Sequence, residues 1–286
     1  MLEDYTDTGV LDDEPFLAAL VMVCSLRSRR EITAHRVPVP DQPDRWGPPF
    51  SRCATKRSSD TRFRPIAGIV VQFVVVVALL FGATGRWNWW QGWVFVGTLV
   101  FGIVASTFHL YVTDKNLFVE RTRSPIQGAQ PASDKVIVLL LVVTFYGSLF
   151  IAPIDVFRLH LLSSTPALVS WLGLLLFSIG WFVASRASYD NTFAVPVVKY
   201  QPERRQEVVD TGLYRIVRHP MYAGGILIYL GMPLWLGSYA TTAVSAIAVA
   251  ALLVRILLEE RFLRQTLPGY AAYEQRVRYR LIPLLW

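Results

Sequence analysis

Residues 223–254 read AGGILIYLGMPLWLGSYATTAVSAIAVAALLV, a run of thirty-two residues without a charged side chain. One membrane-spanning helix needs about 20 apolar residues, so this run is too long for one span and too short for two full ones. Gly237 and Ser238 lie at its middle. The run therefore predicts a tight hairpin of two short helices, each about 24 to 27 Å long.

Small residues on the two arms of this hairpin predict close packing of its backbones, because a missing or short side chain lets membrane helices approach each other. They are Gly224, Gly225 and Gly231 on the first arm and Ala246 and Ala250 on the second.

Four more uncharged runs, of nineteen to twenty-four residues, precede the hairpin: 66–85, 89–112, 136–154 and 167–185. Each is long enough to span a membrane. The chain is 53% hydrophobic and only 17% charged, against about 25% charged residues in soluble domains. We therefore expect an all-α integral membrane protein with about six transmembrane helices, the last two forming the hairpin.

The charges along the chain predict its orientation. Residues 1–65 carry ten basic and ten acidic side chains, so the net charge of +7 belongs to residues 66–286. With both termini in the cytoplasm, 26 of the 28 Lys and Arg residues lie on that side, and only Arg86 and Arg158 lie outside. This asymmetry predicts a multi-pass protein of the cell membrane. It argues against a nucleic-acid partner, because the basic residues are not gathered on one solvated face.

Trp87, Trp89, Trp90 and Trp93 cluster at the expected outer boundary, as an aromatic belt would.

Residues 1–65 are expected to be a flexible polar extension, rich in Pro at 37–49. Their apolar stretch 16–26 is too short to span a membrane and follows three acidic residues, so it does not resemble a secretory signal. A surface helix and an upstream start codon both remain open. Cys24 and Cys53 lack the spacing of a metal site, and we expect no metal. Residues 66–286 form the membrane domain, with its site in 186–286.

Polar residues at both ends of the hairpin are the candidates for chemistry. His219 stands at its start, and Glu259 and Glu260 follow its end, so the turn brings them to one cytoplasmic face. Pro220 fits the first helical turn, where backbone N–H groups can bind a carboxylate. Tyr214 and Tyr222 add aromatic faces and hydroxyls. Such groups suit a cofactor with an amino-acid end, an adenine and a cationic sulfur, in a cytoplasmic cofactor pocket.

Two stretches carry a family resemblance. Residues 210–225, DTGLYRIVRHPMYAGG, and the later LLEERFL (257–263) with PGYAAYEQRVRYRLIP (268–283) resemble the isoprenylcysteine carboxyl methyltransferase and phospholipid methyltransferase group of membrane enzymes. The resemblance covers roughly residues 184–286. It departs in having Gly-Leu-Tyr where Gly-Pro-Tyr is common and Gln206 where a His is often seen.

The resemblance implies methyl transfer from S-adenosylmethionine to a lipophilic acceptor, whose head group could be a carboxylate, an amine or a thiol. It also implies Arg255 and either Glu259 or Glu260 as catalytic residues. We hypothesise that Arg255 orients an acidic or polar head group and that Glu260 orients the cofactor or accepts a proton. The cofactor-binding residues that the resemblance implies are Gln206, Glu207, Val208, Val209, Tyr214, His219, Pro220, Met221 and Tyr222.

Several of these side chains could instead have a purely structural role. Arg255 and Glu259 are four residues apart and could form only a helix-surface ion pair. Five further arginines could be anchors to lipid phosphates, and Tyr270 and Tyr273 could anchor the tail, which in the family closes over the cofactor. The five are Arg215, Arg218, Arg276, Arg278 and Arg280.

Two other functions are alternatives. Membrane sterol reductases that use NADPH share the closing Tyr, Arg and Ile-Pro pattern, but usually have Arg-Asp where this chain has Glu259 and Glu260. A non-catalytic multi-span protein is disfavoured because no span carries a deep charged residue. We expect a lipophilic substrate and membrane lipids as partners, and no obligate protein partner is evident.

Overall fold

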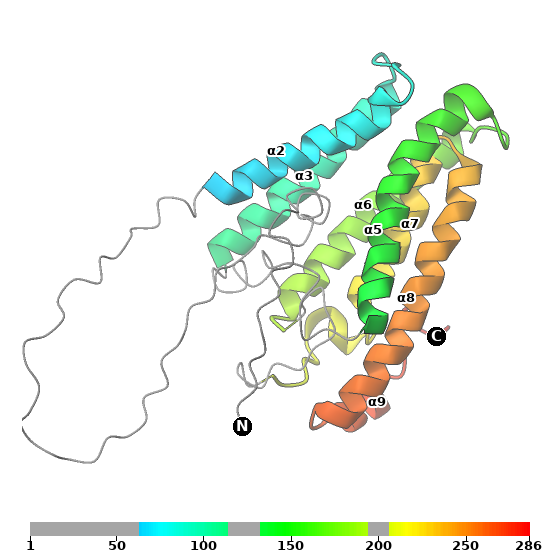
Figure 1. The fold of residues 1–286 in the computed structure, drawn as a ribbon. Helices are drawn as coiled ribbons and strands as arrows, with labels where there is room; N and C mark the ends of the chain where they lie inside the picture. Colours follow the sequence, from blue (N-terminus) through cyan, green and yellow to red (C-terminus); the bar gives the residue numbers. More distant parts are fainter. Residues whose placement is uncertain (1–62, 114–131, 194–205) are drawn as a thin grey trace, which may run out of the picture.

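The computed structural model describes residues 63–113, 132–193 and 206–286, and this part of the chain is helical with no β-strand. Its helices form an elongated bundle (Figure 1). They are α2 (Phe63–Val77) with the π-helical turn η1 (Ala78–Gly82), α3 (Trp90–Thr113), α5 (Ala132–Ile154) with the π-helical turn η2 (Asp155–Leu159), α6 (Ala167–Asp190), the 3-10 turn η4 (Gly212–Arg215), α7 (Pro220–Trp235), α8 (Tyr239–Thr266) and α9 (Tyr270–Arg276).

Most of the predicted polar extension, with Cys24 and Cys53, lies outside the described residues. Four described helices are long and apolar enough to cross a membrane, namely α3, α5 with η2, α6 and α8. A shorter apolar helix covers Gly68–Gly82, and α7 has only 16 residues. The chain is thus a multi-pass membrane protein, as predicted, whereas the count of six spans stays a prediction.

The hairpin turns where the sequence predicts, but its arms are unequal. Gly237 has a φ of 92°, in the left-handed region that favours glycine. The Ser238 side chain then caps α8 by accepting a hydrogen bond from the Thr241 N–H. Helix α8 has 28 residues, about 42 Å, against about 24 Å for α7. The second arm is longer than predicted, because the charged residues after Val254, such as Glu259 and Arg264, are good helix formers and continue the helix.

Two of the three glycines of α7, Gly224 and Gly231, pack against α6. For these two, the prediction that they bring the hairpin arms together is wrong. Gly224 faces Gly180, and a Cβ on Gly180 would lie 2.6 Å from the Gly224 carbonyl oxygen. Gly231 meets Gly173 in the same way. Both helices space their glycines seven residues apart, so the two contacts occur together and clamp α6 to α7. Only Gly225 faces α8, with a Cβ position 3.4 Å from Leu252.

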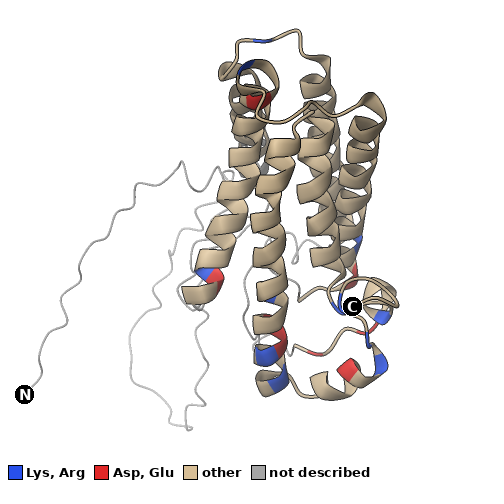
Figure 2. Ribbon diagram, turned by 90° about the vertical axis from the view of Figure 1, so that its right-hand side faces the viewer, with Lys and Arg blue, Asp and Glu red and all other residues tan. Residues whose placement is uncertain are grey.

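The two ends of the bundle differ in charge (Figure 2). One end, which we call the charged end, carries most of the described charged side chains, from Asp134 on α5 to Glu259 and Glu260 on α8. The opposite end holds Trp87, Trp89, Trp90 and Trp93 and is called the tryptophan end. Three of these indoles are exposed, whereas Trp89 is buried.

A buried carboxylate closes the tryptophan end. Asp155 is 3% exposed. Its Oδ2 accepts a hydrogen bond from the Ser238 hydroxyl at 2.6 Å, and its Oδ1 accepts one from the Leu161 N–H at 2.8 Å. These bonds tie the end of α5 to the turn between α7 and α8, so the hairpin is fixed at the end opposite to its polar residues.

Candidate active site

A cavity opens at the charged end, where α7 begins and the second half of α8 passes beside it. Its walls come from the end of α6, the segment 206–214, the start of α7, the outer half of α8, and α9. The lining residues are Asn191, Phe193, Gln206, Glu207, Val208, Val209, Tyr214, Arg218, His219, Met221, Tyr222, Glu259, Phe262, Leu263, Leu267, Tyr270 and Tyr273.

Nearly all of the residues that the resemblance implies for the cofactor meet at this cavity. Eight of the nine line it, and the ninth, Pro220, is buried at the first turn of α7. Of the three candidate catalytic residues, Glu259 lines the cavity, whereas Arg255 and Glu260 lie behind the wall. The structure thus separates the two neighbouring glutamates. It places Glu259 in the wall, and it buries Glu260, to which the sequence hypothesis gave the role at the cofactor, behind the wall.

A tight turn places Tyr214 in the wall. Gly212 has a φ of 56° and lies against the Asp190 carboxylate, so that a Cβ would collide with it. The same carboxylate accepts a hydrogen bond from the Leu213 N–H at 2.9 Å. Only glycine fits this combination of positive φ and close approach. The turn η4 that follows directs Tyr214 to the cavity.

The segment before α7 is held by the tail of the chain. The backbone N–H groups of Arg218 and His219 donate to the carbonyl oxygens of Tyr279 and Arg280, both at 2.9 Å. In addition, Nη1 of Arg218 donates to the Val277 carbonyl oxygen at 2.9 Å. The tail therefore fixes the strip of chain that presents His219 to the cavity.

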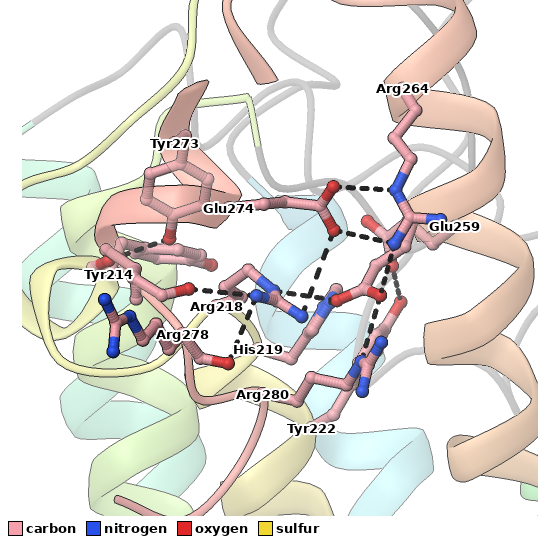
Figure 3. A network of polar contacts seen from close by, with 12 residues as sticks. Tyr214, Arg218, His219, Tyr222, Glu259, Arg264, Tyr273, Glu274, Arg278 and Arg280 are labelled. Atoms are coloured by element: carbon pink, nitrogen blue, oxygen red, sulfur yellow. Dashed lines mark hydrogen bonds and ion pairs between the residues drawn. The ribbon is translucent and has the colours of Figure 1, made fainter. Parts of the chain in front are cut away.

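Glu260 is the centre of a buried ionic network, and Figure 3 labels its partners Arg218, His219, Arg264 and Arg280. It is 1% exposed. Its Oε1 lies 2.8 Å from Nε of Arg218 and 3.2 Å from Nε2 of His219, and its Oε2 accepts from Nε of Arg280 at 2.9 Å and lies 3.4 Å from Nη2 of Arg264. Arg218 and Arg280 are thus internal partners of Glu260, and the suggestion that they only anchor lipid phosphates is wrong. The network fixes His219 from behind.

Glu259 has a different neighbourhood. Its Oε2 accepts a hydrogen bond from the Tyr222 hydroxyl at 2.6 Å. The rings of Tyr222 and His219 are stacked, with centroids 5.6 Å apart and an interplanar angle of 12°. His219, Tyr222 and Glu259 therefore form one connected part of the wall, with a carboxylate next to two rings.

Arg255 pairs with a carboxylate of α5 and does not line the cavity. It is 6% exposed, and its Nη2 lies 2.9 Å from Oδ1 of Asp134. Its guanidinium carbon lies 5.7 Å from the centroid of the Tyr222 ring. Arg255 is thus buried next to the lining residue Tyr222 and does not itself line the cavity, and the hypothesis that it orients a head group stays a prediction.

Helix α9 closes the last side of the cavity. Tyr270 and Tyr273 are 4% and 2% exposed. The Tyr273 hydroxyl donates to the Tyr214 carbonyl oxygen at 2.7 Å and so joins α9 to η4. Burial raises the pKa of Tyr270, and the negative charges of Glu260 and Glu259 raise it further. Both tyrosines therefore act as neutral groups here.

Sequence reasoning missed several lining residues. Phe262 and Leu263 lie one helical turn after Glu259, so the period of α8 could have placed them on its face. Arg218 directly precedes His219, but its type suggested an anchor. Asn191 and Phe193 follow α6 directly, and no local pattern marks them.

Comparison with known proteins identifies the segment that builds most of this site. Residues 168–268 match the family model described as phospholipid methyltransferase. For this segment, which we call the family segment, the match confirms the resemblance to phospholipid methyltransferases that the sequence predicts. The family segment runs from the first turn of α6 to just past α8 and includes the whole hairpin. It leaves α5 and α9 outside.

One curated relative is the cobalt-zinc-cadmium resistance protein CzcN of Cupriavidus metallidurans. It is 30% identical to this chain over 108 residues, which is 37% of this chain. The match covers 49% of the relative, so the chain spans about half of the length of that protein.

Proposed function

We propose that this chain is an integral membrane methyltransferase that takes a methyl group from S-adenosylmethionine and transfers it to a lipophilic acceptor at the charged end. The observation that carries the proposal is the single cavity that collects Gln206, His219 and Tyr222 from one end of the hairpin and Glu259 from the other. These residues come from the family segment, and the cavity lies at the end of the apolar helices.

The chemistry of the lining fits S-adenosylmethionine. Glu207 and Glu259 supply negative charge for a sulfonium or an ammonium group, and the tyrosine rings supply faces that attract cations. Val208, Leu263 and Leu267 supply apolar surface for an adenine. His219 and Gln206 supply polar groups for a carboxylate or a ribose.

The bound donor supplies an activated methyl group, and the residues of this chain do the rest. Methyl transfer in line needs alignment and a favourable electrostatic setting more than acid–base chemistry. Tyr222 holds the Glu259 carboxylate through its 2.6 Å hydrogen bond. Glu259 attracts positive charge in the cavity and can take up the proton that an amine or thiol acceptor releases. Glu260 keeps His219 in place from behind.

The position of the cavity supports a lipophilic acceptor. The apolar helices place the charged end at the edge of the membrane, where lipid head groups lie and where exposed Val136, Leu139 and Val254 mark the membrane-facing surface. We further propose that this end faces the cytoplasm of the cell, in keeping with the distribution of Lys and Arg along the sequence.

Binding measurements test the proposal. The protein, purified in detergent, is titrated by calorimetry with S-adenosylmethionine, S-adenosylhomocysteine and NADPH. We expect the first two to bind and Tyr222→Ala to weaken both, with Asp155→Asn at the tryptophan end as the control that binds normally. Binding of NADPH alone would overturn the methyltransferase proposal in favour of a reductase. Methyl-deuterated donor added to membranes, followed by mass spectrometry of lipid extracts, would then identify the acceptor.

A further inference from the structure

A buried ion pair lies directly behind the cavity. Asp134 stands in the first turn of α5 and is 4% exposed, and Arg255 of α8 is 6% exposed. Oδ1 of Asp134 lies 2.9 Å from Nη2 of Arg255. Asp134 precedes the family segment by more than thirty residues. Helix α5 therefore adds a negative charge to the site from a part of the chain that the family match does not cover.

Contacts connect this pair to the cavity wall. The Arg255 guanidinium lies over the Tyr222 ring, with 5.7 Å between its central carbon and the ring centroid. Tyr222 in turn donates its hydroxyl hydrogen bond to Glu259. Tyr222 and Glu259 line the cavity, whereas Asp134 and Arg255 do not. A change at Asp134 thus reaches the cavity through one arginine and one tyrosine.

Glu259 is a second carboxylate, placed one helical turn after Arg255 on the same helix. Glu259 follows Arg255 by four residues on α8, a spacing at which opposite charges on a helix attract each other. A buried arginine that loses its carboxylate must find another, because an uncompensated buried charge is strongly unfavourable. Without the charge of Asp134, Arg255 would be drawn to Glu259, and the Glu259 carboxylate would be drawn away from Tyr222 and the cavity.

We propose that Asp134 is a positioning residue that, by pairing with Arg255, keeps the negative charge of Glu259 available to the cavity. There it favours a cationic ligand over a neutral one of the same shape. The inference rests on the proposed function, because the cation concerned is the sulfonium of S-adenosylmethionine. S-adenosylhomocysteine is its neutral counterpart, so the ratio of the two affinities measures this charge preference without any acceptor.

The test compares this ratio in the full-length wild-type protein and in Asp134→Asn by calorimetry in detergent. We expect the affinity for S-adenosylmethionine to fall about tenfold, since one charge at about 10 to 12 Å is worth about that much near a protein surface. The affinity for S-adenosylhomocysteine should change less than about twofold, because it carries no sulfonium charge. Asp134→Glu keeps the charge and should therefore keep most of the wild-type ratio of the two affinities. It also gives a measurable variant at this position if Asp134→Asn does not fold.

Two controls separate positioning from general damage. Asp155→Asn removes an equally buried carboxylate from the far end of the same helical segment, and we expect an unchanged ratio. In an Arg255→Gln background, Asp134→Asn should alter the ratio by less than about twofold, because the residue through which Asp134 acts is already gone.

The outcomes are distinct. Equal weakening of both ligands by Asp134→Asn, or a ratio like that of Asp155→Asn, would overturn the role of Asp134 while leaving the proposed function in place. A wild-type protein that binds neither ligand would overturn the proposed function and the inference together.

Discussion

The bundle buries a carboxylate at the tryptophan end, Asp155, and two at the charged end, Asp134 and Glu260. The surroundings of Asp155 and Glu260 are opposite in kind. Asp155 at the tryptophan end is satisfied by neutral donors, the Ser238 hydroxyl and the Leu161 N–H. Glu260 at the charged end is surrounded by arginines and lies next to His219. The neutral donors hold the Asp155 carboxylate by hydrogen bonds alone and bring no charged side chain to it. A group of cations around one carboxylate instead fixes several side chains at once, and one of these, His219, faces a cavity.

The difference teaches that burial of charge alone does not mark a functional site. Asp155 and Glu260 are both almost fully buried. Only Glu260 has partners that continue into a cavity, through Arg218 and His219. Glu274 adds a second carboxylate to this network, with Oε2 at 2.6 Å from Nε of Arg264. The network around Glu260 thus immobilises several long side chains to hold one wall of the cavity, at a cost in conformational entropy. The hydrogen bonds of Asp155 immobilise fewer side chains.

The largest expected effect comes from removing the charge at the centre of the network. Glu260→Gln removes the carboxylate that lies 2.8 Å from Arg218, whose side chain is 6% exposed, and leaves this arginine the Glu274 carboxylate at 3.9 Å. Breaking such a buried pair costs about 3 to 5 kcal/mol. We expect a fall of this size in the free energy of unfolding, measured by denaturant titration in detergent. Glu274→Gln is the matched control, and its more exposed pair with Arg264 should be worth about 1 kcal/mol or less. Equal losses in the two variants would contradict this account.

The second prediction sets the neighbouring glutamate against Glu260. Glu259→Gln should leave the free energy of unfolding within about 1 kcal/mol of wild type, because this side chain is half-buried and lies in the cavity wall. It should lower the rate of methyl transfer about 100-fold, as loss of a group that acts on the reacting atoms does. Single-turnover measurement with saturating donor gives that rate. Full activity of Glu259→Gln would exclude a catalytic role.

At the tryptophan end we expect a substitution to lower the stability of the protein and to leave its binding of the donor unchanged. Asp155→Asn weakens the tie to Ser238 and should cost about 1 to 3 kcal/mol of unfolding free energy. The donor should bind the folded protein with unchanged affinity, since the cavity is at the other end of the bundle. Thermal unfolding in the presence and absence of donor measures both quantities. A loss of donor affinity would show that the two ends are coupled.

The sequence predicts the fold well where length and charge decide it. The run 223–254 and the glycine at 237 locate the hairpin turn, because an uncharged run of thirty-two residues is longer than one span needs. The same run predicts the wrong length for α8, since the loss of apolar character at Arg255 does not end a helix. It also misdirects Gly224 and Gly231, because a glycine shows that a neighbour is close but not which helix supplies it.

The sequence motifs predict part of the candidate site, and only the tertiary packing shows the rest. His219, Tyr222 and Glu259 are found from their places at the two ends of the hairpin. The separate environments of Glu259 and Glu260 cannot be predicted in this way, because consecutive residues on a helix point about 100° apart and only the packing decides which one faces inward. Asp134 comes from a distant helix, and no spacing along the chain connects it to Arg255.

The smallest expected effect concerns the hydrogen bond between α9 and η4. The pH dependence of the unfolding free energy distinguishes its contribution from others. Tyr273→Phe removes the donor to the Tyr214 carbonyl oxygen and should cost about 0.5 to 1.5 kcal/mol below pH 9. Burial raises the pKa of Tyr273, so the hydroxyl stays protonated in the folded protein while an unfolded tyrosine ionises near pH 10. This contribution is therefore complete below about pH 10 and is lost above it, by up to about 1.4 kcal/mol per pH unit. Unfolding curves of wild type and Tyr273→Phe should converge above pH 10. A difference that stays constant from pH 7 to 11 would show that the Tyr273 hydroxyl is open to solvent and that α9 does not close the cavity.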